Sequence, residues 1–334
     1  MIITRRRLLG YGAAGVLAMP YVAKAQAQPI RLVFSHHIPT NHLAHRTAER
    51  FAAEVNKGTN GQVTIDIRPA SQLFNLRTSA EALQLGTLDF AWTDLGTLAN
   101  WQPQFGFTSV PFLFNDYDHV KKVLYGQIGE QIVADVKSTL GVDILCLGAS
   151  GFRIFCTKKE IKSADDLRGI KLRVPEIPVY VEMARALGTN PTPIPAGEIY
   201  TALQTGVIDG FEGPADFVQT GKQYEVAKFV TRTHHIFTEV SMMGSVKKMA
   251  SLPANVQKVI REAAVEATSK WMWETNLKEQ TDAWTDLTTK ATANASPNIT
   301  SFRSKMGPVI DSFVAKAGPK AKAYIEAVQA AGKA

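Results

Sequence analysis

The chain has 334 residues, of which 45% are hydrophobic and 20% charged, and a formal net charge of +7. This size and composition fit two α/β domains of ordinary size or one large domain. Four basic residues lie in the first 27 positions, and without them the charge falls to +3, from 33 basic and 30 acidic residues. Because the remaining Lys and Arg residues are scattered, the charge does not indicate nucleic-acid binding.

Residues 1–27 have the pattern of a signal peptide. A basic start, "TRRRLLG", precedes an apolar stretch over Leu8–Val22 and small residues suited to cleavage after Ala25 or Ala27. The apolar stretch is shorter than the roughly 20 residues that span a membrane. The start resembles a twin-arginine export motif, although leucine and glycine replace its usual phenylalanine and lysine. We therefore expect a soluble mature protein in the periplasm.

The first half of the mature chain alternates strands and helices. Strands are predicted at 30–36, 63–69 and 88–93, with helices at Leu43–Asn56 and Thr78–Leu85, which end near Gly58 and Gly86. Strands that alternate with helices in this way indicate α/β layers with largely parallel sheets.

The same order returns in the second half. Strands are predicted at 170–175 and 207–213, with helices at Val179–Leu187 and Glu198–Thr205 between them. The unit of helix, glycine and strand occurs once in each half, as "EALQLGTLDFAW" and "YTALQTGVIDGFEG". Two matching halves predict two similar α/β domains that face each other. A segment from Ala254 to about Ala293 without internal proline or glycine predicts one very long helix, or two collinear helices, long enough to run along both domains.

Cys146 and Cys156 are the two cysteines of the chain. An oxidising compartment allows a disulfide between them. However, both lie in apolar runs, "DILCLG" and "FRIFCTK", where a free cysteine commonly acts as a small hydrophobic residue. The sequence leaves both alternatives open.

No catalytic motif of a hydrolase, a P-loop NTPase or a zinc protease occurs in the mature chain. Four histidines at positions 36, 37, 42 and 45 could suggest a metal cluster, but a strand end followed by a helix start would scatter them. Ligand contacts or solvated loops suit these histidines better. Asp165 and Asp166 in "SADDLRG" fit a helix N-terminus rather than an acid/base pair. We expect no metal and no cofactor.

Arg173 ends the short strand "IKLRVP", just before a loop that contains two prolines. Most arginines are exposed, so the residue pattern alone favours a solvent-facing arginine on an edge strand.

A long stretch, "SADDLRGIKLRVPEIPVYVEMARALGTNPTPIPAGEIYTALQTGVIDGFEGP", resembles the central signature of the DctP-type substrate-binding proteins of TRAP transporters. "ASQLFNLRTSAEALQLGTLDFAW", "VPFLF" and "LPANVQKVIREAA" extend this resemblance over nearly the whole mature chain. It implies two α/β domains joined by crossing strands and a long helix, which close on a ligand. The implied first domain is 28–150 plus about 239–278, and the second is 151–238 plus about 279–334.

The resemblance also answers why an arginine ends the strand. It implies that Arg173 forms a salt bridge with a ligand carboxylate, a role that the rigid guanidinium fork fills and lysine does not. Arg153 matches a second, variably used arginine, or is a surface charge between the domains. Trp92 either adds an aromatic wall or lies in the core. The other positions implied to line the cleft are His37, Asn75 and Asp94 in the first domain and Glu176, Ala196, Phe211, Glu212 and Gly213 in the second.

Departures from the family pattern bear on the ligand. Sugar-acid receptors commonly read "DGQENP" where this chain reads "DGFEGP", which loses two amides and gains an aromatic ring. This favours a monocarboxylate with an apolar or aromatic body, the alternatives being a dicarboxylate or a sugar acid. No tryptophan follows Glu212, so the Glu-Trp pair that holds a cation in lactate and 2-oxoacid receptors is missing.

The class of protein implied is a monomeric receptor that works with TRAP membrane subunits. The alternatives are a ligand-sensing partner of a signalling receptor, and an enzyme that uses Arg173 with Glu212 or Asp94. Against an enzyme, the sequence lacks a recognisable nucleophile and general base.

Overall fold

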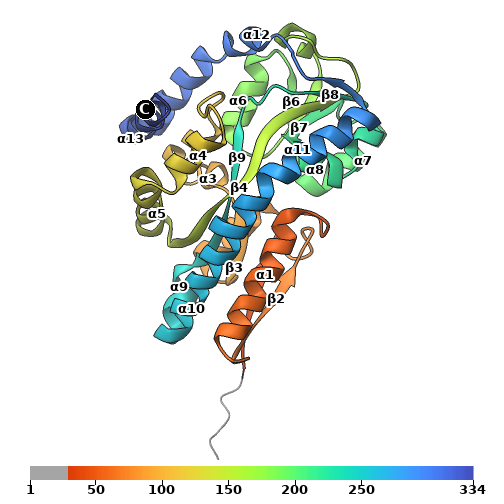
Figure 1. Cartoon of the computed structure of the whole chain (residues 1–334). Helices are drawn as coiled ribbons and strands as arrows, with labels where there is room; N and C mark the ends of the chain where they lie inside the picture. Colours follow the sequence, from red (N-terminus) through yellow and green to blue (C-terminus); the bar gives the residue numbers. More distant parts are fainter. Residues whose placement is uncertain (1–28, 334) are drawn as a thin grey trace, which may run out of the picture.

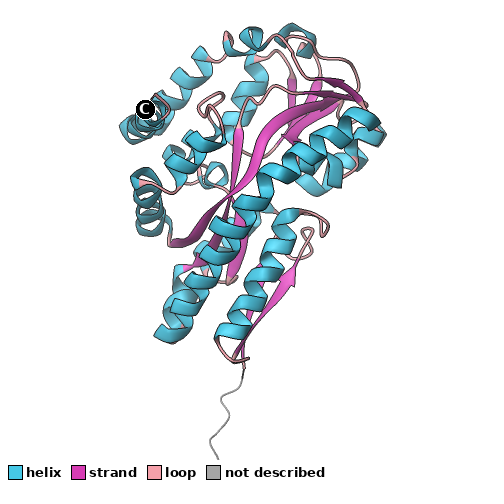
Figure 2. Ribbon diagram, viewed as in Figure 1, coloured by secondary structure: helices cyan, strands magenta, loops and turns pink. Residues whose placement is uncertain are grey.

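The computed structural model describes residues 29–333, so the predicted signal peptide lies outside the described residues. Two α/β domains share one mixed sheet of ten strands, and helices cover both of its faces (Figures 1 and 2). No helix within residues 29–333 is both long enough and apolar enough to span a membrane. The expectation of two similar domains with crossing strands and a long helix is confirmed.

The first domain is built on the strand order β2-β1-β3-β9-β4. Strands β1, β2 and β3 are parallel, whereas β9 runs antiparallel to β3 and β4. The strands are β1 (Ile30–Ser35), β2 (Val63–Arg68), β3 (Phe90–Thr93), β4 (Val142–Thr157) and β9 (Phe237–Ser245). The helices are α1 (Leu43–Gly58), α2 (Leu76–Leu85), α3 (Leu95–Leu98), η1 (Pro103–Ser109), α4 (Tyr117–Leu124), α5 (Gln127–Leu140) and α9 (Val246–Ser251).

The second domain continues the sheet in the order β4-β7-β5-β6, with β8 also paired to β4 and β10 paired to β8. The strands are β5 (Lys171–Val174), β6 (Asn190–Pro193), β7 (Gly210–Pro214), β8 (Phe229–Thr231) and β10 (Thr292–Asn294). The helices are η2 (Ala164–Leu167), α6 (Pro178–Ala186), η3 (Ala196–Glu198), α7 (Ile199–Thr205), α8 (Ala215–Thr220), η4 (Gln223–Glu225) and α12 (Ile299–Arg303).

Three segments pass between the domains. Strands β4 and β9 cross side by side, and a continuous helical rod lies along them (Figure 1). The rod consists of α10 (Ala254–Ala264), a π-helical segment η5 (Val265–Met272) and α11 (Trp273–Lys290). The predicted long helix over 254–293 is thus present, with an unpredicted π segment at its centre and β10 in place of its last residues.

The rod is fixed to β4 at the crossing point. The carbonyl oxygen of Ser150 accepts hydrogen bonds from Gln280 Nε2 at 2.6 Å and Asn276 Nδ2 at 3.1 Å. The next residue, Gly151, has φ of +134°, and a Cβ there would lie 2.8 Å from the Gln280 side chain. The pairing of β4 with β9 also shifts register between Ala149 and Gly151. A glycine is therefore required where β4 passes the rod.

The C-terminal helix α13 (Gly307–Ala331) contacts η1 of the first domain and α6 of the second. It is kinked at Gly318, whose backbone is not helical, and Pro319 follows the kink. Tyr324 stacks on Phe107 with ring centroids 4.8 Å apart. Lys320 pairs with Asp135 at 2.7 Å. The last helix therefore braces the first domain in addition to the second.

The repeated sequence unit occupies the same place in both domains. Helix α2 ends at Gly86 and leads into β3, and α7 ends at Gly206 and leads into β7. Both glycines have positive φ, 79° and 76°, which a residue with a Cβ adopts at a cost.

The prediction of a largely parallel sheet is wrong for the crossing strands, because β4 and β9 run antiparallel to their neighbours.

The two cysteines lie on one strand. Cys146 and Cys156 both belong to β4, are buried and are free. Ten residues of strand extend about 33 Å, far beyond the roughly 7 Å that a disulfide can bridge. The disulfide alternative is therefore wrong, and both residues act as small hydrophobic side chains.

Candidate ligand-binding site

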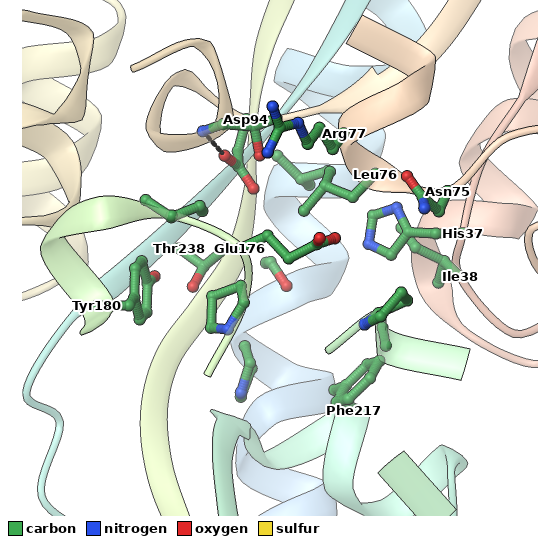
Figure 3. A pocket seen from close by; sticks show the side chains of 18 of the residues that line it. His37, Ile38, Asn75, Leu76, Arg77, Asp94, Glu176, Tyr180, Phe217 and Thr238 are labelled. Carbon is green, nitrogen blue, oxygen red and sulfur yellow. Dashed lines mark hydrogen bonds between the residues drawn. The ribbon is translucent and has the colours of Figure 1, made fainter. Parts of the chain in front are cut away.

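A cleft between the two domains contains most of the residues implied to bind ligand (Figure 3). The cleft and the open solvent at its mouth together have a volume of about 880 Å³. Loops after β1 and β3 supply its first-domain wall, and the loop after β5 with α6 supplies much of the opposite wall. The predicted residues that line it are His37, Asn75, Asp94, Arg153, Arg173, Glu176 and Ala196.

Arg173 lies inside the sheet, because its strand β5 is flanked by β7 and β6. The residue is 5% exposed, so a solvent-facing arginine on an edge strand is wrong. Its Nε donates a hydrogen bond to Ile194 O at 2.9 Å, and within residues 29–333 its two Nη atoms make no hydrogen bond. Burial and the nearby Arg153 lower the pKa of Arg173 to about 10. It is still charged at neutral pH, with the N–H groups of both Nη atoms available in the cleft.

Arg153, unlike Arg173, already has a counter-charge within the protein. Its Nε and Nη2 both reach the carboxylate of Glu212, the Nη2–Oε1 distance being 2.8 Å, and its Nη1 donates to Thr238 Oγ1 at 2.9 Å. The ring of His235 lies 3.3 Å from the same carboxylate. Burial opposes ionisation of Glu212, but Arg153 and His235 outweigh it and lower the pKa of Glu212 to about 2. This group is a closed ion-pair network at the edge of the cleft.

The first-domain wall presents carboxyl groups and a neutral histidine. Asp94 caps α3, with Oδ1 accepting from Thr97 N at 2.6 Å, and Glu239 of β9 lies beside it in the wall. Burial and the charge of Asp94 raise the pKa of Glu239 to about 8. Burial, together with Arg173 and His42, lowers the pKa of His37 to about 3. His37 is therefore neutral at pH 7, and its buried Nδ1 has no partner in the described chain.

Glu176 extends into the cleft toward His37 from the loop before α6 (Figure 3). Asn75 lines the opposite wall and also caps α2, its Oδ1 accepting from Thr78 N at 2.9 Å. The side-chain oxygen of Asn75 is therefore already used in a hydrogen bond to α2, which leaves its amide nitrogen for a ligand.

Several expected contacts are not part of the cleft. Trp92 is fully buried in the first-domain core, where its Nε1 donates to Ala44 O at 2.8 Å, so the aromatic-wall alternative is wrong. Phe211 is equally buried and packs in the second-domain core. Gly213 and Glu212 also lie outside the cavity lining, the latter behind Arg153. Alternation along β7 points Phe211 into the core and Glu212 to the opposite face, where Arg153 takes its carboxylate, and Gly213 has no side chain to offer a ligand.

Other lining residues were not predicted from the sequence. Glu239 is the clearest, since an acidic residue in the apolar strand "FTEVSMMGS" is itself a signal. Tyr180 and Thr238 gave no such signal, because a tyrosine in a helix and a threonine in a strand are ordinary. The further unpredicted lining residues with polar side chains are His42, Arg77, Thr97 and Ser150.

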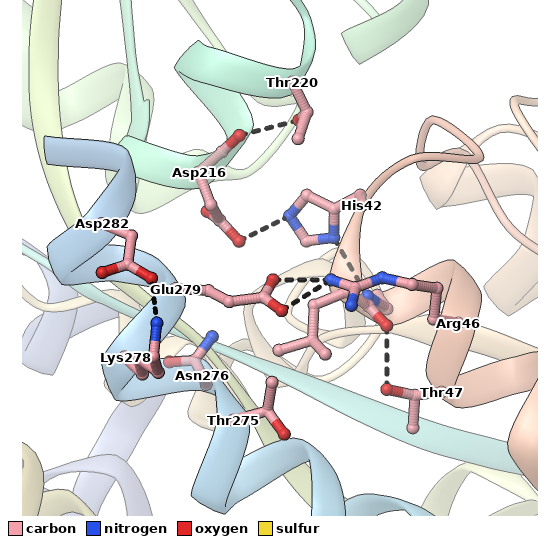
Figure 4. Close-up of polar contacts among 12 residues, drawn as sticks. His42, Arg46, Thr47, Asp216, Thr220, Thr275, Asn276, Lys278, Glu279 and Asp282 are labelled. Carbon is pink, nitrogen blue, oxygen red and sulfur yellow. Dashed lines mark hydrogen bonds and ion pairs between the residues drawn. The ribbon is translucent and has the colours of Figure 1, made fainter. Parts of the chain in front are cut away.

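Polar contacts join the domains beside the cleft (Figure 4). His42 Nε2 lies 2.9 Å from Asp216 Oδ2, and both side chains are almost fully buried. Arg46 of α1 pairs with Glu279 of α11 at 2.6 Å. The first turn of α1 is thus fixed against α8 and α11.

The four histidines do not form a metal site. His36 Nε2 and His45 Nδ1 are 3.0 Å apart, whereas His42 pairs with Asp216 and His37 faces the cleft. Across residues 29–333, no three or more His, Cys, Asp or Glu side chains are grouped to hold a metal ion.

Two α/β domains joined by crossing strands, with a buried, unpaired arginine in the cleft between them, define a solute-binding protein of the two-domain extracytoplasmic type. The sequence from residue 34 to residue 317 matches the model of the bacterial extracellular solute-binding protein family 7, DctP. The chain belongs to this family, whose members include TRAP periplasmic solute-binding proteins.

Characterised relatives and solved structures agree with this assignment. The chain is 31% identical over 268 residues to the C4-dicarboxylate-binding periplasmic protein DctP of Rhodobacter capsulatus, covering 80% of each protein. A TRAP solute-binding protein of Polaromonas bound to D-erythronate superposes with a TM-score of 0.84 at 29% identity, covering 90% of this chain and 98% of that one. One of Xanthobacter autotrophicus with bound β-D-galacturonate also gives 0.84, at 30% identity, with coverage of 90% and 99%.

Proposed function

We propose that this protein is the periplasmic receptor of a TRAP transporter and binds a small hydroxylated carboxylic acid with its carboxylate on Arg173. The unpaired guanidinium of Arg173, 5% exposed and facing the cleft, is the observation that carries this proposal. A buried cation with unused donors is costly, and a bidentate carboxylate supplies both the opposite charge and the missing acceptors.

The apolar or aromatic ligand body inferred from "DGFEGP" loses its basis in the structure. Phe211 packs in the core and Gly213 does not line the cavity, so neither residue contacts a ligand in the cleft. The wall opposite Arg173 instead carries polar side chains, among them His37, Asn75 and Asp94. D-erythronate and galacturonate in the solved relatives support the sugar-acid alternative.

A dicarboxylate fits this cleft less well, because its second carboxylate would need another free cation. Arg153 is already paired with Glu212, and Arg77 pairs with Glu81 at 3.4 Å. The ligand we propose therefore carries one carboxylate and several hydroxyl groups.

When the two domains close, both walls of the cleft would contact the ligand. We take the domains as 28–150 with about 239–278, and 151–238 with about 279–334, which places the boundaries near the crossing of β4, β9 and the rod. Contacts between the domains such as His42 with Asp216, which are present in this structure, would be made on closure and broken on opening. The closed form would then dock on the TRAP membrane subunits, and residues 1–27 would direct export to the periplasm through the twin-arginine route.

A thermal-shift screen tests the proposal. D-erythronate, D-galactonate and D-galacturonate are compared with erythritol and galactitol, which carry hydroxyl groups but no carboxylate. An acid at about 100 times its dissociation constant should stabilise the protein by roughly 2.7 kcal/mol, whereas the neutral polyols should not. Native mass spectrometry of the purified protein would identify an acid that co-purifies. Equal stabilisation by polyols and acids would contradict a carboxylate receptor.

A further inference from the structure

Two carboxyl groups from different segments meet in the first-domain wall of the cleft. Asp94 follows β3, and Glu239 lies on the crossing strand β9. Glu239 is 3% exposed; its Oε1 accepts from Leu95 N and its Oε2 from Ser241 Oγ at 2.7 Å. Asp94 Oδ1 accepts from Thr97 N, which leaves Oδ2 without a hydrogen bond from the described chain.

The charged groups around this pair do not neutralise it. Arg153 of β4 is the nearest cation, and Glu212 already compensates it. Arg173 of β5 faces the same cavity, but so does Glu176. Tyr180 of α6 also faces the pair and stays neutral, because burial raises its pKa. Two neighbouring carboxyl groups that are desolvated without a cation of their own cannot both stay ionised near neutral pH.

We propose that Asp94 and Glu239 hold one proton between them and use it to bind hydroxyl groups of the ligand at the end opposite its carboxylate. This inference rests on the proposed function, since it concerns the same cleft. The hydroxyl of Thr97, on a residue that is 1% exposed, lies in the same wall beside the Asp94 carboxyl group.

A half-protonated pair suits a hydroxylated ligand for a simple reason. The protonated carboxyl donates a hydrogen bond and the ionised one accepts, while each ligand hydroxyl does both. A ligand with an aliphatic chain would leave these groups desolvated and unpaired, at a cost for each. The raised pKa values of both acids, about 8 for Glu239, agree with a single shared proton at pH 7.

Binding should therefore depend on both ligand hydroxyl groups and pH. The test compares D-galactonate with hexanoate and D-erythronate with butyrate by calorimetry at pH 6, 7, 8 and 9. The hydroxylated acid of each pair should bind at least about tenfold more tightly. Its affinity should fall about tenfold from pH 7 to pH 9, because the pair loses its proton with a pKa near 8. Glu239→Gln should remove this pH dependence, and Glu262→Gln on the surface should not.

The shared proton can also be tested in the ligand-free protein, so that the result does not depend on which ligand is chosen. Carbon-13 NMR of the carboxyl groups should show one group that titrates near pH 8 and is missing in Glu239→Gln. Because the folded pKa is raised above the unfolded value of 4.5, the contribution of Glu239 to stability is complete below about pH 4.5 and is lost as the pH rises to about 8. The variant should flatten this part of the melting-temperature profile.

The outcomes separate the two proposals. Equal binding of hexanoate and galactonate would overturn hydroxyl recognition and leave the carboxylate receptor intact. No binding by any of the four acids would overturn the proposed function, and hydroxyl recognition with it. A ligand-free protein in which all carboxyl groups titrate below pH 6 would overturn the shared proton, whatever the ligand.

Discussion

Replacing Arg173 with lysine should separate ligand recognition from fold stability. Lysine keeps the positive charge but cannot make paired hydrogen bonds to a carboxylate. Hydrogen bonds to charged groups contribute roughly 1.5 to 3 kcal/mol, so Arg173→Lys should weaken acid binding on the order of 10 to 100-fold. Arg173→Ala, which also removes the charge, should weaken binding further.

The ligand-free stability should change little. Arg173 gives the fold one hydrogen bond, to Ile194 O, worth about 1 kcal/mol. Against this gain stands the cost of an unpaired buried charge beside Arg153, which a flexible lysine ammonium can reduce by moving into the cleft. We therefore expect an unchanged or slightly raised melting temperature for the ligand-free variant.

The assay measures the dissociation constant by calorimetry and the ligand-free melting temperature on the same samples. Arg168→Lys is the matched control, since Arg168 has a side chain that is 78% exposed and should tolerate the change. Arg153→Lys is the opposite control, because it disturbs the buried pair with Glu212 and should lower the melting temperature. Binding by Arg173→Lys within a factor of two of wild type would refute the role given to Arg173.

Three further predictions concern the fold around the cleft. A bound acid should reduce the radius of gyration in small-angle scattering, because both walls reach it only when the domains close; an unchanged profile at saturation would contradict this. Glu212→Gln should cost roughly 3 to 5 kcal/mol in urea unfolding, since it leaves Arg153 buried without a counter-charge. Gly151→Ala should cost about 1 to 3 kcal/mol in the same assay, because alanine strains the positive φ and its Cβ would lie 2.8 Å from Gln280.

The sequence predicted most of the regular elements because their signals are local. Glycines at 86 and 206 end the helices of the two repeated units, and the structure places both in the left-handed region. The start of α2 was placed two residues late, at Thr78 instead of Leu76, because the asparagine cap before it was not recognised as a cap. The prediction of a largely parallel sheet holds for the pairings among β1, β2 and β3 and among β5, β6 and β7. It fails at the crossing strands β4 and β9, because these pair with residues distant in sequence, which no local pattern shows.

The residues of the candidate site were also predicted only in part, because their orientation and partners depend on distant parts of the chain. The resemblance placed His37, Asp94 and Glu176 on the cleft, and the structure brings them together. It could not show that Phe211 turns into the core, since a shift of one residue along a strand reverses the face of a side chain. Nor could a motif show that Arg153 is already paired while Arg173 is not, because their partners come from other strands.

Because Arg153 is paired and Arg173 is free, closure of the domains can depend on which ligand is bound. Arg153 lies in the second-domain part of β4 and is paired with Glu212 on the neighbouring strand β7, so this ion pair moves as one unit when the domains rotate. Arg173 lies on β5 of the second domain and Asp94 after β3 of the first, so the distance between them changes on closure. A ligand that reaches from the free guanidinium to Asp94 holds the domains at one separation. An acid too short to span it, or without a hydroxyl at its far end, would neutralise Arg173 but leave the first-domain wall unpaired and the closed state less stable.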